Sequence, residues 1–216
     1  MSIANNLSAI KQNIPTQVTL VAVSKTKPVS AIQDAYLAGQ RVFGENKVQE
    51  MVTKHEELPK DISWHMIGHL QSNKVKYMAH FVDLIHGVDR FSTLKEINKQ
   101  AKKHNRVIHC LLQFKIANEA TKFGLTQDEI TSILANETYK NMENIKIVGL
   151  MGMASFVADE VQIRNEFRKL KALYEQLKPH QPQFTTVSMG MSGDYQIAIE
   201  EGSTMVRVGS AIFGQR

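Results

Sequence analysis

The sequence predicts a closed (β/α)8 barrel formed by a single domain over residues 1–216. Short apolar, β-rich runs alternate strictly with segments of helical spacing, and this alternation is typical of a parallel sheet. Eight such units follow one another without a linker, low-complexity segment or repeat that would divide the chain, and eight units favour a closed barrel. An open doubly wound sheet is the alternative, but it usually has fewer strands, and no G-x-G-x-x-G follows the first strand.

The first five units follow a short amphipathic helix that we expect within residues 1–13. Residues 18–24 are apolar on both alternating faces, as expected of a strand covered by helices. Ser30 and Gln33 have capping-box spacing and predict the start of the next helix, which Gly39 ends. Further strands are expected at 41–44, 63–67, 81–86 and 107–114, and further helices at 47–55, 75–79 and 92–104.

The last three units begin with a second capping box. Thr126 and Glu129 predict a helix that extends to about residue 135. Apolar residues at helical spacing from Ile163 to Leu177 predict a long helix that ends before Pro179. The remaining strands are expected at 145–151, 184–188 and 204–208, with a short helix at 195–201.

Composition and charge narrow the classes of function. No apolar run is long enough to span a membrane, and the N-terminal residues lack the pattern of a signal peptide. The single cysteine, Cys110, excludes an intramolecular disulfide, favours a cytoplasmic location and is predicted to pack in the core. The net charge of +5 is spread along the chain without a basic block or an aromatic platform, which argues against nucleic-acid binding.

The strongest candidate for chemistry is the lysine that ends the first strand. In period-2 geometry Lys25 lies on the same buried face as Val21 and Val23. Desolvation there would lower the pKa of the amine, and the like charge of Lys27 would act in the same direction. A Schiff base requires a neutral amine. A lysine whose charged end reaches solvent at the end of the strand is the alternative.

Other polar residues follow later strands of the predicted barrel, at the end where barrel sites lie. Arg207 shares a face with Met205 within the last strand, and an arginine inside a barrel must be hydrogen-bonded or ion-paired. Loops after the seventh and eighth strands often bind phosphate, and here they contain Ser188, Gly190, Gly193, Gly209 and Ser210. Together with the lysine amine they suggest pyridoxal phosphate or a sugar phosphate, although turn chemistry also explains each glycine alone.

Several other motifs give no functional prediction. His65 and His69 lie on a strand end and a loop without an H-E-x-x-H pattern, so no metal site is expected. The segment 54–57, Lys-His-Glu-Glu, is predicted to be a solvated helix end. No P-loop and no G-x-S-x-G elbow is present. Four methionines are expected to pack around the barrel mouth, where they could line a flat ring: Met151, Met153, Met189 and Met191.

Blocks of sequence along nearly the whole chain resemble the pyridoxal phosphate homeostasis protein family, which is similar to the N-terminal barrel domain of alanine racemases. The blocks are V-A-V-S-K-T-K-P at 21–28, F-G-E-N at 43–46, V-Q-E at 48–50, W-H at 64–65, I-G at 67–68, L-Q-S-N-K at 70–74, G-L-M at 149–151, S-M-G-M-S at 188–192 and G-S-T-M-V-R-V-G at 202–209. The resemblance implies a TIM barrel of the alanine racemase N-terminal type that binds pyridoxal 5'-phosphate (PLP).

The resemblance also implies roles for individual residues. Lys25 would hold PLP as an internal aldimine, and Arg207 would face the pyridine nitrogen and keep it unprotonated. The expected phosphate ligands are Ser188, Gly209 and Ser210, with the backbone of Met189 and Gly190. The residues expected around the ring are Asn46, His65 and Met151.

The function that the resemblance implies is intracellular vitamin B6 homeostasis. The protein would hold PLP and release it to other proteins, possible recipients being apo forms of PLP-dependent enzymes, without an established reaction of its own. Racemase activity is not expected, because the second domain that supplies a catalytic tyrosine in alanine racemases has no counterpart after the eighth unit. We expect a cytoplasmic monomer with no nucleic-acid, membrane or metal partner.

Three alternative functions and one additional site stay open from the sequence. The chain could be a PLP-dependent fold-III enzyme acting on an unassigned amino acid. It could be a Schiff-base aldolase acting on a sugar phosphate, or a nucleic-acid-binding protein that uses its basic surface. Lys27, Lys74 and Lys122 are candidates for a second PLP site.

Overall fold

Eight parallel strands close into a barrel in sequence order, with β8 paired to β1. The computed structural model describes residues 2–117 and 123–215. The strands are β1 (Thr19–Val23), β2 (Val42–Glu45), β3 (Ser63–Met66), β4 (Leu84–Val88), β5 (Ile108–Gln113), β6 (Ile145–Met151), β7 (Thr186–Ser188) and β8 (Met205–Val208). The predicted (β/α)8 barrel is confirmed.

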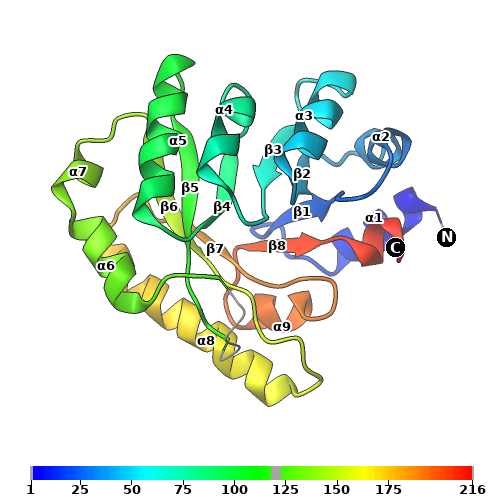
Figure 1. Ribbon diagram of the computed structural model, residues 1–216. Helices are drawn as coiled ribbons and strands as arrows, with labels where there is room; N and C mark the ends of the chain where they lie inside the picture. The colour runs from blue at the N-terminus through cyan, green and yellow to red at the C-terminus, as the bar shows by residue number, and fades with distance from the viewer. Residues whose placement is uncertain (1, 118–122, 216) are drawn as a thin grey trace.

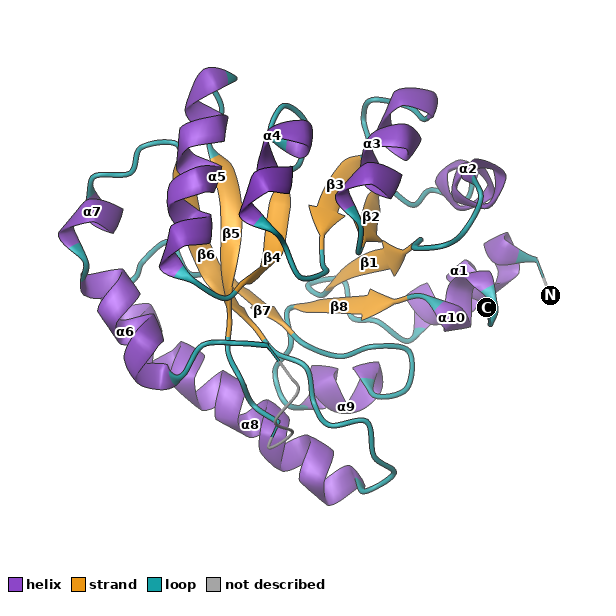
Figure 2. Cartoon of the chain, viewed as in Figure 1, coloured by secondary structure: helices purple, strands orange, loops and turns teal. Residues whose placement is uncertain are grey.

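Helices connect successive strands and surround the barrel (Figure 1). They are α1 (Ile3–Gln12), α2 (Val29–Leu37), α3 (Val48–Glu57), η1 (Ser72–Lys74), α4 (Val75–Met78), α5 (Phe91–Lys103), α6 (Gln127–Ala135), α7 (Glu137–Lys140), α8 (Glu160–Leu177), η2 (Lys178–His180), α9 (Tyr195–Glu200) and α10 (Ser210–Phe213). Figure 2 shows the orange strands inside this shell, with α2 to α5 along the upper side and the long α8 along the lower side.

The two predicted capping boxes have different outcomes. The box at Thr126 is confirmed, since its side chain accepts from the Glu129 amide and the Glu129 carboxylate accepts from the Thr126 amide. The box at Ser30 is wrong, because α2 begins at Val29 with Pro28 as its N-cap and no side-chain cap. The Ala31 amide donates to the Pro28 carbonyl at 3.1 Å. Ser30 therefore lies inside the first turn, where it cannot cap the helix.

The fourth strand begins later than its apolar run predicts. The amides of Phe81 and Val82 both donate to the carbonyl of Met78, at 3.1 and 2.9 Å. These residues therefore complete the turn that follows α4, and β4 starts only at Leu84. The shift matters for the site, because it places His86 in the middle of β4.

Apolar side chains form two clusters, one on each side of the strands. The barrel interior holds Val21, Leu84, Leu111, Val148, Met151 and Met205. The larger cluster lies between the strands and the helices, and it includes Leu20 and Ala22 of β1 together with Trp64 and Phe167. Alternate residues of β1 thus face opposite sides, as period-2 geometry requires.

The first and last helices lie side by side next to the β1–β8 junction, where both chain ends are found (Figure 1). The Asn6 side-chain amide donates to the Ile212 carbonyl at 3.0 Å. The Lys27 amine donates to the carbonyls of Gly214 and Gln215, each at 3.0 Å. These bonds fasten the end of the described chain beside the loop that follows β1.

Among the described residues, no helix is long and apolar enough to cross a membrane.

Candidate cofactor site

The first strand ends in a tight turn that contains Lys25. Val21 faces the interior, and Leu20 and Ala22 face the helices, so continued alternation places Ser24 on the helix side and Lys25 on the interior side. The Lys27 amide closes the turn by donating to the Ser24 carbonyl at 3.0 Å. The half-buried Lys25 therefore leaves β1 at the C-terminal end of the barrel.

Arg207 lies on β8, directly beside this strand. Its partner in register is Val21 of β1. The side chain is buried, and it donates through Nη1 to Ser188 Oγ at 2.6 Å and through Nη2 to the Gly152 carbonyl at 3.1 Å. Burial lowers the pKa of the Arg207 guanidinium to about 10, partly opposed by the negative charge of Asp194. Arg207 thus remains a cation at neutral pH.

A continuous chain of polar side chains runs from Arg207 across the barrel. Ser188 Oγ on β7 lies 3.0 Å from His86 Nδ1 on β4, and His86 Nε2 lies 3.1 Å from His65 Nδ1 on β3. His65 Nε2 in turn lies 3.4 Å from Ser63 Oγ. We call this set, from Arg207 to Ser63, the cross-barrel chain.

One assignment of the histidine tautomers satisfies every member of the cross-barrel chain. In it, the Ser188 hydroxyl accepts from Arg207, which can only donate, and donates to His86 Nδ1. The Nε2 proton of His86 then points to His65 Nδ1, and the Nε2 proton of His65 points to Ser63. Both histidines must be neutral for this order, and burial lowers the pKa of His65 to about 3. Burial and the charges of His65 and Arg207 also lower the pKa of His86.

Sequence reasoning identified Arg207, Ser188 and His65 but missed His86. The available signal was its place in a strand whose other residues are apolar. A histidine there is either paired or costly to bury. Its partners come from β3 and β7, however, so their identity depends on the register and closure of the sheet.

The loops that follow β7 and β8 are held together. The Gly209 amide donates to Ser192 Oγ at 3.1 Å, and the Met191 amide donates to Asp194 Oδ1 at 2.5 Å. Gly190 has a φ of 97°, and a Cβ there would lie 2.6 Å from the Cβ of Ala198. Only glycine fits this position, so the chain can turn back toward β8. Ser192 was not predicted as a site residue.

The other predicted site residues lie at several depths. Met151 belongs to the interior cluster, whereas Met189 belongs to the helix-side cluster and its amide donates to the Met205 carbonyl at 3.1 Å. Ser210 begins α10 and is exposed. Asn46 follows β2, and a Cβ on Gly68 would lie 2.4 Å from its carbonyl oxygen. The loops after β2 and β3 therefore touch at Asn46.

The remaining lysine and histidine candidates lie apart from the cross-barrel chain. Lys27 contacts the C-terminal carbonyls described above, and the Lys74 amine lies 5.8 Å from the centroid of the Tyr77 ring. Lys122 lies outside the described residues. His69 pairs with Asp89 at 3.1 Å. Among the described residues, no group of three or more His, Cys, Asp and Glu side chains could hold a metal ion.

Cys110 is buried in the core as predicted, and burial raises the pKa of its thiol.

The prediction of a solvated helix end at residues 54–57 is wrong for Lys54. Its side chain is buried and its amine contacts Glu45 Oε1 and Glu50 Oε1, each at 2.7 Å. The signal was present in the helical spacing, because Lys54 follows the buried residues Val48 and Met51 at intervals of three.

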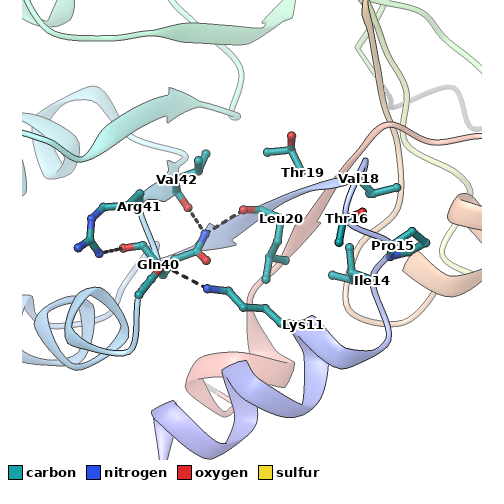
Figure 3. Close-up of a pocket in the computed structure, with 11 residues that line it drawn as sticks. Lys11, Ile14, Pro15, Thr16, Val18, Thr19, Leu20, Gln40, Arg41 and Val42 are labelled. Atoms are coloured by element: carbon teal, nitrogen blue, oxygen red, sulfur yellow. Dashed lines mark hydrogen bonds between the residues drawn. The ribbon is translucent and has the colours of Figure 1, made fainter.

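A surface pocket of about 370 Å³ lies at the opposite end of the barrel. Figure 3 shows Lys11 and Gln40 at its wall, beside the first residues of β1 and β2. Gln40 Nε2 donates to the carbonyls of Leu20 and Val42, and Lys11 donates to Gly39. The pocket therefore contains none of the residues predicted to bind a cofactor.

Comparison with known proteins assigns the family. The model of the alanine racemase N-terminal domain matches residues 1–216. A pyridoxal phosphate homeostasis protein from Vibrio alginolyticus is 44% identical over 94% of this chain and 88% of its own length. One from Escherichia coli K12 is 37% identical over 99% and 97%. The chain belongs to the pyridoxal phosphate homeostasis protein family.

Solved structures agree with this family assignment. PipY from Synechococcus elongatus, solved with PLP bound, is 34% identical, with a TM-score of 0.90 over 99% of this chain and 100% of PipY. An alanine racemase from Clostridium difficile has a TM-score of 0.83 at 14% identity, and the match covers 100% of this chain but 60% of the racemase. The racemase comparison shows a shared barrel fold. The resemblance inferred from the sequence blocks is confirmed.

Proposed function

We propose that this chain binds PLP as an aldimine of Lys25 and serves intracellular vitamin B6 homeostasis. One observation carries the proposal. Lys25 follows β1, Arg207 lies on β8, and the two strands are paired in register at Val21 and Arg207. The Lys25 amine and the buried Arg207 guanidinium thus belong to two adjacent strands, toward the C-terminal end of the barrel. The names of the relatives and the PLP-bound structure of PipY support the same ligand.

The side chains present fit PLP by their donor chemistry. PLP, when bound, supplies an aldehyde and an electron-accepting ring. The Arg207 guanidinium has five N–H donors and no acceptor, so it can donate to a pyridine nitrogen but cannot accept a proton from it. Ser188, held by His86, orients the guanidinium. A ring nitrogen facing Arg207 stays unprotonated, which makes the ring a weak electron sink.

The loops after β7 and β8 fit a phosphate. In this proposal the phosphate lies against Gly190 and Ser192 on one side and Gly209 and Ser210 on the other, where glycines let backbone amides approach an anion. Met189 supports the first loop through the hydrogen bond that its backbone amide donates to the Met205 carbonyl. Asn46, His65 and Met151 lie around the ring, at the ends of β2, β3 and β6.

The first experiment is an absorption spectrum of the protein with PLP, before and after borohydride reduction. We expect a visible band of a pyridoxal imine, and reduction fixes the label on Lys25. Lys25→Ala loses the label at that position. A protein that stays colourless with added PLP contradicts the proposal, and a sugar phosphate then becomes the better ligand.

We assign the protein a carrier role, in which bound PLP passes to other proteins, among them apo forms of PLP-dependent enzymes. The test measures the rate at which an apo-enzyme gains activity from the loaded protein. We expect this rate to exceed the rate of PLP release into a trap without the enzyme. Equal rates contradict handover. Amino-acid turnover above that of Lys25→Ala would instead support a fold-III enzyme.

A further inference from the structure

A buried ion cluster lies on the helix side of the Lys25 turn. Lys54, on α3, is 4% exposed, and its amine contacts three oxygens: Glu45 Oε1 at 2.7 Å, Glu50 Oε1 at 2.7 Å and the Ser24 carbonyl at 2.8 Å. One cation therefore joins two carboxylates and the backbone of the residue that precedes Lys25.

Both neighbours of Lys25 are held by this cluster. Before it, Ser24 is held at its carbonyl by Lys54 and at its hydroxyl by Glu45 Oε1, at 2.5 Å. After it, the Thr26 amide donates to Glu50 Oε1 at 2.5 Å. The residues before and after Lys25 are thus each hydrogen-bonded to a carboxylate, and both carboxylates form ion pairs with Lys54.

The backbone of the turn needs such support. Thr26 has a φ of 64°, in the left-handed region that threonine rarely adopts. The Lys27 amide also donates to the Ser24 carbonyl, and the third position of such a turn usually holds glycine. A strained conformation persists only where its surroundings determine it, and here the Glu50 carboxylate binds the amide of the strained residue itself.

Lys54 approaches from outside the sheet. Ser24 and Glu45 lie on the helix side of β1 and β2, whereas Lys25 leaves toward the barrel interior. The desolvated Glu45 carboxylate, whose Oε2 atom has no hydrogen-bond partner among the described residues, depends on Lys54 and Ser24 for its compensation. Lys54 therefore acts on the site through the turn.

We propose that Lys54 is a positioning residue that holds the Lys25 amine in place for bond formation with an aldehyde. The proposal rests on the proposed function. In the step concerned, the Lys25 nitrogen bonds to the aldehyde carbon, the carbonyl oxygen leaves as water, and the two amine protons end in that water. Misplacement of a reacting group by about 1 Å can slow a reaction about a hundredfold, so this step is sensitive to the turn.

The test compares two ligands that differ only at the reacting group. PLP has the aldehyde, whereas pyridoxamine 5'-phosphate has the same ring and phosphate but cannot form the bond. We expect Lys54→Met to lower the rate of imine formation with PLP by about tenfold or more and to leave the affinity for pyridoxamine phosphate within about twofold. Lys54→Arg, which keeps the charge, should recover part of the rate.

A matched control is available on α8. Lys171 forms an i,i+4 pair in the reverse order with Glu175, at 2.6 Å and partly exposed, and Lys171→Met should change neither quantity. Glu50→Gln serves as a second variant if Lys54→Met does not fold, since it keeps the shape but weakens the bond to Thr26. We expect it to lower the rate of imine formation in the same selective way.

The outcomes separate the two proposals. Imine formation at the wild-type rate in Lys54→Met, or in Glu50→Gln where the first variant does not fold, overturns the positioning role and leaves PLP binding intact. If Lys54→Met weakens the binding of pyridoxamine phosphate as much as it slows imine formation with PLP, the positioning role is also overturned, because the residue would then support the fold as a whole. If the wild-type protein binds neither ligand, the proposed function itself fails.

Discussion

At the scale of single residues, the barrel interior is organised by neutral histidines between an arginine and a serine. In the tautomer assignment given above, Ser188, His86 and His65 each accept a hydrogen bond on one side and donate one on the other. Such a chain is stable only when it is complete, since a buried polar atom without a partner costs about 1–3 kcal/mol. Through Ser188, which contacts His86, the cross-barrel chain also fixes the orientation of the Arg207 guanidinium in the barrel interior.

Substitution of His86 tests this arrangement. His86→Phe keeps an aromatic ring but removes the partner of His65 Nδ1 and one of the two partners of Ser188 Oγ, which still accepts from Arg207. We expect the free energy of unfolding to fall by about 2–4 kcal/mol, measured by urea denaturation. His69→Phe, at a pair near the surface, should cost less than about 1 kcal/mol. Equal effects of the two substitutions would show that the chain contributes nothing to stability.

Sequence reasoning named some residues of the candidate site and missed others, for a physical reason. Arg207 could be found because it is a charged residue inside an apolar strand, and Lys25 because it directly follows one. The roles of His86 and Lys54 depend on hydrogen-bond partners that lie on other elements. Those partners depend on sheet register and helix rotation, which no local pattern specifies. The predicted strand 81–86 already contained His86, but no local pattern places it beside Ser188 and His65.

At the scale of elements, close contact between strands places strict demands on one glycine. Gly149 of β6 pairs with Thr186 of β7, and a Cβ at Gly149 would lie 1.8 Å from the Thr186 carbonyl oxygen. The residue also has a φ of 154°. The pairing of β6 with β7 therefore requires the absence of a side chain.

We expect Gly149→Ala to lower the free energy of unfolding by at least about 3 kcal/mol, because the two strands must move apart. Gly193→Ala is the matched control, since a Cβ there meets no atom within 4 Å. Thermal unfolding of the two variants beside the wild type gives the comparison. A Gly149→Ala protein as stable as the control would contradict the observed strand spacing.

Element boundaries follow local chemistry only in part. Thr126 and Glu129 supply both halves of a capping box within one turn, so the start of α6 could be predicted. At α2 the same signal fails, because Pro28 has no amide proton and a fixed φ that suits a helix entry. The proline then sets the first turn before Ser30 is reached.

At the scale of the whole molecule, the protonation of buried histidines makes stability depend on pH. The pKa of His65 is lowered to about 3 and that of His86 is also lowered, while in the unfolded chain each is near its usual value. Between these values the unfolded state binds protons that the folded state does not. The free energy of unfolding therefore falls as the pH is lowered below about 6.5.

We expect His65 to contribute a loss of about 2 kcal/mol between pH 7 and pH 5, and His86 to contribute a further loss in the same direction. The measurement is urea denaturation at both pH values for the wild type and for His86→Phe. The variant should lose less stability than the wild type over this range, because it lacks the titration of His86. Burial raises the pKa of Glu45, although the bonds from Lys54 and Ser24 oppose this rise. A raised carboxyl pKa increases the free energy of unfolding as the pH falls, and it does so in the wild type and in the variant alike. Identical pH dependence of the two proteins would contradict the buried, neutral state of His86.

The pairing of β1 with β8 has a consequence for how the protein is made. Lys25 is synthesised well before Arg207, yet they belong to adjacent strands. Until β8 has been synthesised and has paired with β1, the lysine has no guanidinium beside it. In the function that we propose, capture of PLP at Lys25 therefore waits until β8 has closed the barrel.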